Sequence, residues 1–154
     1  MTRKTERSSR ARTLSRRLAM QALYQWQLTA QSLAELRNQF AAEEGYAEVD
    51  AEYFEVILRG TVDGAGELDT ALAALIDRPV AQLDPIEHAV LLIGLFELGQ
   101  RPETPFRVVI NEGVELAKKF GATDGHKFVN AVLDRAARNL RAAEQAATPK
   151  TARR

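Results

Sequence analysis

The stretch IEHAVLLIGLFELG, residues 86–99, carries few polar side chains and decides how the rest of the chain must pack around it. Its pattern predicts a helix that is apolar nearly all round. A helix of this kind is typically buried in the middle of a bundle. Asp84 and Pro85 mark its start, because a proline at the first helical position loses no useful N–H. Gly99 marks its end.

Helical signals continue on the C-terminal side of this segment. Thr104 and Pro105 repeat the same start signal and predict a helix that ends at Gly121. Asp124 is expected to cap a last helix that runs to about Arg141. No alternating strand pattern and no internal repeat interrupts these segments.

The N-terminal side is also predicted to be helical. A first helix is expected over about residues 13–29. Ser32 and Glu35 form a capping box that opens a second helix, and Gly45 fits a left-handed cap at its end. Asp50 is expected to cap a third helix, with a bend or break at the glycines that follow it. The fold class is therefore all-α, with about seven helices.

The helices predict one domain of residues 13–142, which a connector divides into helical halves at about 13–80 and 84–142. Residues 1–12 are expected to form a basic, flexible tail, and residues 143–154 a disordered one. A chain of 154 residues is long enough to bury a core of its own.

The charges are balanced overall but unevenly distributed. Cations crowd both ends of the sequence, and the middle is acidic. Basic ends on an acidic body indicate a polyanion partner held at one edge. The alternative is that the ends are two solvated tails.

Several functional classes are excluded. Cysteine is absent, which removes disulfides and thiolate chemistry and is compatible with a reducing cytosol. The two histidines lack metal-ligand spacing, and the sequence contains neither a phosphate-binding loop nor a nucleophile elbow. No apolar run approaches the ~20 residues that a bilayer requires. We therefore expect a cytoplasmic protein without enzymatic activity, metal or membrane contact.

The first helix separates into two faces on a helical wheel. The expected core face consists of Leu18, Ala19, Ala22, Leu23 and Trp26. The opposite strip consists of Thr13, Arg17, Met20 and Tyr24, with Arg16 at its margin. Arginines bind phosphate bidentately, and an exposed aromatic ring stacks on a splayed base, so this strip suits single-stranded RNA. The alternative is that Tyr24 packs under a neighbouring helix.

The last helix repeats this arrangement. Its inward residues are expected to be Phe128, Val129, Val132, Leu133 and Leu140, with Phe128 at the boundary. Asp124 either caps this helix or accepts a hydrogen bond from a base edge. The N–H groups at the start of the helix are suited to a phosphate.

The central helix has one strip of mixed character. It consists of Glu87, Val90, Leu91, Gly94 and Glu97. Such a strip is either ordinary packing or a docking face for another protein.

Three motifs carry a resemblance to a known family. They are ALYQWQL (residues 22–28), INEGVELAKKFG (110–121) and HKFVNAVLD (126–134). In this order and spacing they closely resemble the NusB family of bacterial transcription antitermination factors. The resemblance implies an all-helical fold of two small bundles without a cofactor. It also implies binding to the single-stranded boxA element of ribosomal RNA transcripts, together with NusE, a small-subunit ribosomal protein. That complex joins the elongating RNA polymerase with other Nus factors and suppresses premature termination.

The resemblance also implies roles for individual residues. Those expected to contact RNA are Arg7, Arg10, Arg12, Arg16, Arg17, Tyr24, Phe120, Asp124, Lys127 and Phe128. Glu87 matches a position assigned to NusE, which favours the docking interpretation of the whole strip from Glu87 to Glu97. The chain departs from the family in spreading its N-terminal cations, with Leu14 and Ser15 between Arg12 and Arg16.

Two alternatives remain at this point. One is a self-associating protein-interaction module, such as a homodimer, with incidental basic tails. The other is an RNA methyltransferase, because NusB-like domains occur fused ahead of ribosomal RNA cytosine methyltransferase domains. The chain contains no glycine-rich cofactor loop for such an activity.

Overall fold

The computed structural model describes residues 3–147, and this range contains helices and turns but no strand. The helices are α1 (Arg3–Thr29), α2 (Leu33–Ala41), α3 (Ala51–Asp63), α4 (Ala65–Ala73), α5 (Pro85–Gln100), α6 (Phe106–Phe120), α7 (Gly125–Leu140) and α8 (Ala142–Ala147). Two short 3-10 helices, η1 (Glu44–Glu48) and η2 (Val80–Gln82), complete the described chain. The all-α prediction is confirmed.

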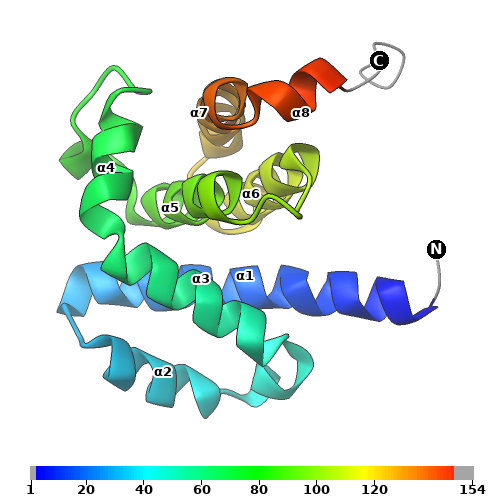
Figure 1. Cartoon of the computed structure of the whole chain (residues 1–154). Helices are drawn as coiled ribbons and strands as arrows, with labels where there is room; N and C mark the ends of the chain where they lie inside the picture. The colour runs from blue at the N-terminus through cyan, green and yellow to red at the C-terminus, as the bar shows by residue number, and fades with distance from the viewer. Residues whose placement is uncertain (1–2, 148–154) are drawn as a thin grey trace.

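Helix α5 lies at the centre of the molecule, as its apolar sequence predicts. In Figure 1, α5 and α6 run across the middle, α1–α3 lie below them and α7 lies above. Helix α5 packs against α1, α3, α4, α6 and α7, so helices from both halves of the chain share it. The Asp84 side chain accepts hydrogen bonds from the N–H groups of Ile86 and Glu87, both at 3.1 Å, and Pro85 occupies the first turn.

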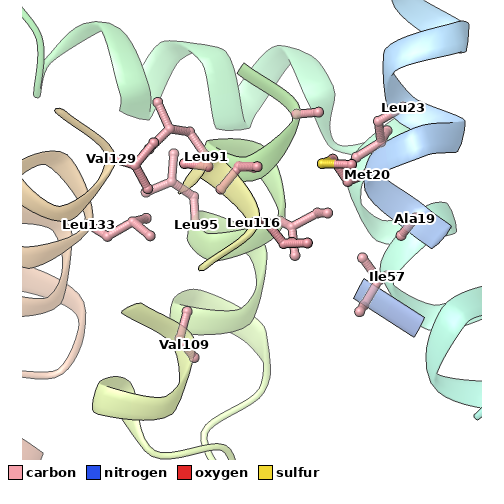
Figure 2. Close-up of a cluster of buried hydrophobic side chains, with 14 of the residues drawn as sticks. Ala19, Met20, Leu23, Ile57, Leu91, Leu95, Val109, Leu116, Val129 and Leu133 are labelled. Atoms are coloured by element: carbon pink, nitrogen blue, oxygen red, sulfur yellow. The ribbon is translucent and has the colours of Figure 1, made fainter. Parts of the chain in front are cut away.

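The core is continuous from α1 to α7. Figure 2 shows Met20 and Leu23 on the α1 side and Val129 and Leu133 on the α7 side, with Leu91 between them. All five side chains are buried. Burying one aliphatic side chain of this size stabilises the fold by roughly 1.5–3 kcal/mol, so this shared core holds the helices together.

Several predicted helix ends are confirmed. The Ser32–Glu35 capping box is present, with both of its hydrogen bonds at 3.1 Å. The Asp50 side chain caps α3 by accepting from the Tyr53 N–H. Helix α3 ends at Asp63 with Gly64 as its C-cap, where the glycines predict a break.

The first helix begins earlier than predicted. Helix α1 starts at Arg3, so the expectation of a flexible tail is wrong for residues 3–12. No glycine or proline interrupts residues 3–29, and Glu6 in the first turn favours the helix dipole.

Part of the expected C-terminal tail is helical as well. Residues 142–147 form α8, whose Glu144 pairs with Arg141 at 2.5 Å and accepts from the Phe106 N–H at 2.9 Å. The expectation of disorder is therefore wrong for residues 143–147. The remaining tail, 148–154, lies outside the described residues.

Four local predictions are also wrong. Helix α2 ends at Ala41, and Gly45 lies in η1 without a positive φ. Helix α6 begins at Phe106 with Pro105 as its N-cap. Met20, which the helical wheel placed opposite the core face, is buried, and α5 packs against α1. Leu140, which was expected to face inward, is 50% exposed at the end of α7.

Candidate nucleic-acid interface

The first turns of α1 form an exposed basic rod. Residues 3–10 are all exposed and include Arg7 and Arg10. Figure 1 shows that this part of α1 extends beyond the helices that pack on its other half. The rod places its cations where a large anion can reach them.

Arg17 joins this rod to the end of α6. Its guanidinium lies 5.0 Å from the ring centroid of Phe120, and the Arg17 side chain is exposed. Phe120 is partly buried against the core. The structure therefore brings together two predicted site residues that are about a hundred positions apart in the sequence.

Tyr24 lies on the same side of α1, two turns beyond Arg17. It is 38% exposed, so it does not pack under a neighbouring helix. It lines a groove of about 660 Å³ between α1 and the segment from α2 to η1, together with Phe40 and Val49. This groove offers an aromatic wall beside a cation, which suits a flat ring.

The buried Glu87 of α5 contacts the turn between α6 and α7 from the inside of the protein. The Glu87 carboxylate accepts from the Ala122 N–H at 3.3 Å. Gly125 packs so closely on it that an added Cβ would lie 2.1 Å from Glu87 Oε2. Burial raises the pKa of Glu87, and the charge of Asp84 adds to this effect. Glu87 thus contributes to the shape of the turn.

The turn presents Asp124 and Lys127 to solvent. Asp124 adopts a left-handed conformation with φ of 63°, and its side chain does not cap α7. It instead lies 3.4 Å from the exposed ammonium of Lys127. The predicted cap is therefore wrong, because the left-handed backbone replaces the extended conformation that a capping side chain requires.

Phe128, in the first turn of α7, is partly buried and covered by Arg78. The Arg78 guanidinium lies 4.2 Å from the centroid of the Phe128 ring. Arg78 was not among the residues that the sequence predicted for the site. No local signal shows that it meets a residue fifty positions later.

The structure corrects the expectation that Arg16 contacts RNA. Arg16 is only 4% exposed, and its guanidinium donates to Glu97 at 2.9 Å and to Glu112 at 2.8 Å. Tyr53 also donates to Glu97. The arginine is held inside the protein because α5 and α6 supply carboxylates at this point of α1.

Arg12 is shared between the protein and solvent. Its guanidinium lies 4.5 Å from the centroid of the Tyr53 ring, and its Nε is 3.7 Å from Asp50 Oδ2. The side chain is nevertheless 36% exposed. Arg12 is thus less accessible than Arg7, Arg10 or Arg17.

The strip on the central helix α5 is not exposed to solvent. Its members, Glu87, Val90, Leu91, Gly94 and Glu97, are all buried. Gly94 packs against Leu133 of α7, and Glu97 binds Arg16 of α1. The strip therefore packs inside the protein and is not the docking face that was expected, because neighbouring helices cover this part of α5.

Two wider features frame the site. No helix among residues 3–147 is both long and apolar enough to span a bilayer. The same residues contain no group of three or more histidine or acidic side chains arranged to hold a metal ion.

Comparison with known proteins shows close relatives. Residues 13–138 match the NusB family. The transcription antitermination protein NusB of Hahella chejuensis is 48% identical over 136 residues, which cover 88% of this chain and 91% of its own. The protein of the same name from Pseudomonas fluorescens strain Pf0-1 is 51% identical over 136 residues, covering 88% and 82%.

Solved structures share the fold. A T. maritima NusB structure has a TM-score of 0.74 and 25% identity, covering 82% of this chain and 89% of its own. A crystal structure of the antitermination factors NusB and NusE in complex with dsRNA has a TM-score of 0.73 and 28% identity, covering 82% and 96%.

The fold and these similarities define the class of protein, which is that of helical, non-enzymatic transcription antitermination factors. Within this class, the chain belongs to the NusB family. The resemblance carried by the three sequence motifs is confirmed.

Proposed function

We propose that this chain binds the boxA element of ribosomal RNA transcripts together with NusE, and joins the antitermination complex of RNA polymerase. The observation that carries the proposal is the Arg17–Phe120 pair beside the exposed Tyr24. Cations and aromatic rings on one face supply phosphate affinity and base stacking together. A role in bacterial transcription places the chain in the cytoplasm.

The proposal divides the work among exposed residues. Arg7, Arg10 and Arg17 supply phosphate contacts, and Tyr24 stacks on a base. Asp124 and Lys127 contribute to base choice from the α6–α7 turn. Arg12 contributes less because Asp50 and Tyr53 already engage it.

NusE is proposed as the protein partner because a structural relative is described in complex with NusE and RNA. The buried strip of α5 does not offer NusE a surface. A partner that depends on Glu87 would therefore recognise the α6–α7 turn, which Glu87 supports.

Fluorescence anisotropy tests the proposal. A labelled boxA-like strand is compared with a scrambled strand and with a duplex across a salt series, with and without NusE. We expect preference for the boxA strand, strengthened by NusE and weakened by salt. Arg17→Ala should lower the affinity, whereas Arg138→Ala, whose exposed cation pairs with Asp134 on α7, should leave it unchanged.

Equal weak binding to all strands, without an effect of NusE, would contradict the proposal. The self-association alternative would then be favoured. Light scattering with and without RNA would measure it directly, because a dimer that covers the arginine face should compete with RNA.

A further inference from the structure

Arg78 combines three properties that few arginines among residues 3–147 share. It is exposed, its guanidinium is stacked on the Phe128 ring at 4.2 Å, and no hydrogen bond or ion pair joins its side chain to another residue within 3–147. In that range, Arg17 has the same combination, stacked on Phe120 at 5.0 Å.

Several other arginines that stack on a ring or lie at the surface are already engaged by the protein, whereas the exposed Arg7 and Arg10 of α1 have no ring of the described chain beneath them. Arg101 pairs with Glu103 at 2.8 Å, and Arg138 pairs with Asp134 at 2.7 Å. Arg16 is saturated by Glu97 and Glu112. The N–H groups of Arg17 and Arg78 thus remain available to an external anion.

Stacking on a ring prepares a guanidinium for binding. The ring attracts the cation and restricts the orientation of its plane, while the N–H groups at its edge stay free. Those groups form a fork that matches two oxygens of a phosphate. An arginine held in this way loses less side-chain freedom when it binds.

The two stacked pairs bracket one turn of the chain. Phe120 is the last residue of α6, and Phe128 lies in the first turn of α7. Arg17 reaches the first ring from α1, and Arg78 reaches the second from the connector after α4. The exposed Lys127 lies between the two rings in the sequence, so the turn is flanked by cations from separate elements.

We infer that Arg78 is a further RNA-contacting residue, which donates to a backbone phosphate on the α7 side of the α6–α7 turn. Arg17 donates to a phosphate on the α1 side. The inference rests on the proposed function and extends the RNA face beyond the N-terminal arginines. A contact of this kind contributes affinity without reading the base sequence.

Anisotropy with the labelled boxA-like and scrambled strands tests the inference, with and without NusE. Arg78→Gln should weaken the binding of both strands by about fivefold and reduce the salt slope by about 0.7, the value for one phosphate contact on a single strand. Arg78→Lys keeps the charge but loses the fork, so its salt slope should match the wild type while its affinity is intermediate.

Arg59→Gln is the matched control, because Arg59 is an exposed arginine on α3 that pairs with Glu55. It should leave both affinity and slope unchanged. All variants should remain folded at the assay temperature, since Arg78 and Arg59 are exposed.

Wild-type affinity and slope in Arg78→Gln would overturn the inference while leaving the proposed function intact. Loss of the NusE effect alone, with RNA binding unchanged, would also overturn it and assign Arg78 to the protein partner. Failure of the wild-type chain to prefer boxA with NusE would instead contradict the proposed function, and the inference with it.

Discussion

The guanidinium of Arg16 is surrounded by Tyr53 from α3, Glu97 from α5 and Glu112 from α6. Burial alone lowers the pKa of Arg16, but the hydrogen bonds and charge of Glu97 outweigh it and raise the pKa above its ordinary value. The arginine therefore remains charged and fastens α1 to the core.

Removing one partner of this pair should be costly. Arg16→Leu leaves Glu97, which is 1% exposed, without its counter-charge, and should lower the free energy of unfolding by about 3–5 kcal/mol. The double variant Arg16→Leu/Glu97→Leu should recover much of this loss, because no buried charge is left unpaired. Urea unfolding measures both, and a double variant as unstable as the single one would contradict the account.

Glu87 predicts a pH effect. Its pKa is higher in the folded than in the unfolded chain, so its ionisation opposes folding and stability declines as pH rises from about 4.3, the ordinary glutamate pKa. Glu87→Gln removes this titration but keeps an oxygen for the Ala122 N–H. The variant should therefore gain stability relative to the wild type between pH 4 and pH 7. Urea unfolding at both pH values tests this, and a relative loss at pH 7 would refute it.

The sequence could predict which residue types form the site, but not which of these residues are exposed and which are buried. Arg16 and Arg17 are neighbours, yet one is buried and the other exposed. The difference lies in Glu97 and Glu112, which are 81 and 96 positions away from Arg16. Arg78 was not predicted for the same reason, because it contacts Phe128, which lies fifty positions later in the sequence.

At the scale of elements, α3 and α5 meet at a glycine. A Cβ on Gly60 would lie 2.1 Å from the Phe96 ring, so the two helices approach closely at this point. The close approach fixes the position of α3, and with it Tyr53, against the central helix.

This contact predicts a stability change. Gly60→Ala should destabilise the protein by about 1–3 kcal/mol, because the gain in helix propensity is outweighed by overpacking. Gly66→Ala in α4 is the control, since nothing lies within 4 Å of its added Cβ, and should be neutral or stabilising. Thermal unfolding compares them. A stabilising Gly60→Ala would show that Phe96 moves aside freely.

Elements were predictable where a cap and an apolar period agreed. The start of α5 at Asp84–Pro85 and the capping box of α2 are examples. The start of α7 after Asp124 was also predictable, but its capping hydrogen bond was not, because Asp124 adopts a left-handed conformation that the sequence pattern does not encode. The length of α1 was missed because its first ten residues lack an apolar face, and helix formation was inferred from that face.

At the scale of the whole molecule, three inward-facing carboxylates and three outward-facing cations have different roles. Glu87, Glu97 and Glu112 support α1 and the α6–α7 turn from inside. Arg17, Arg78 and Lys127 face outward around the same elements. Although the net charge of the chain is zero, the surface around Arg17, Arg78 and Lys127 therefore attracts anions.

The continuous α1 helix has a consequence for the speed of RNA capture. A 27-residue helix is about 40 Å long, and its first turns carry cations well away from the acidic body. Such a projection attracts a polyanion before the final complex forms and thereby raises the association rate. In stopped-flow measurements, Arg7→Gln/Arg10→Gln should slow association at low salt and leave dissociation nearly unchanged. The reverse pattern would mean that these arginines act only after the RNA has docked.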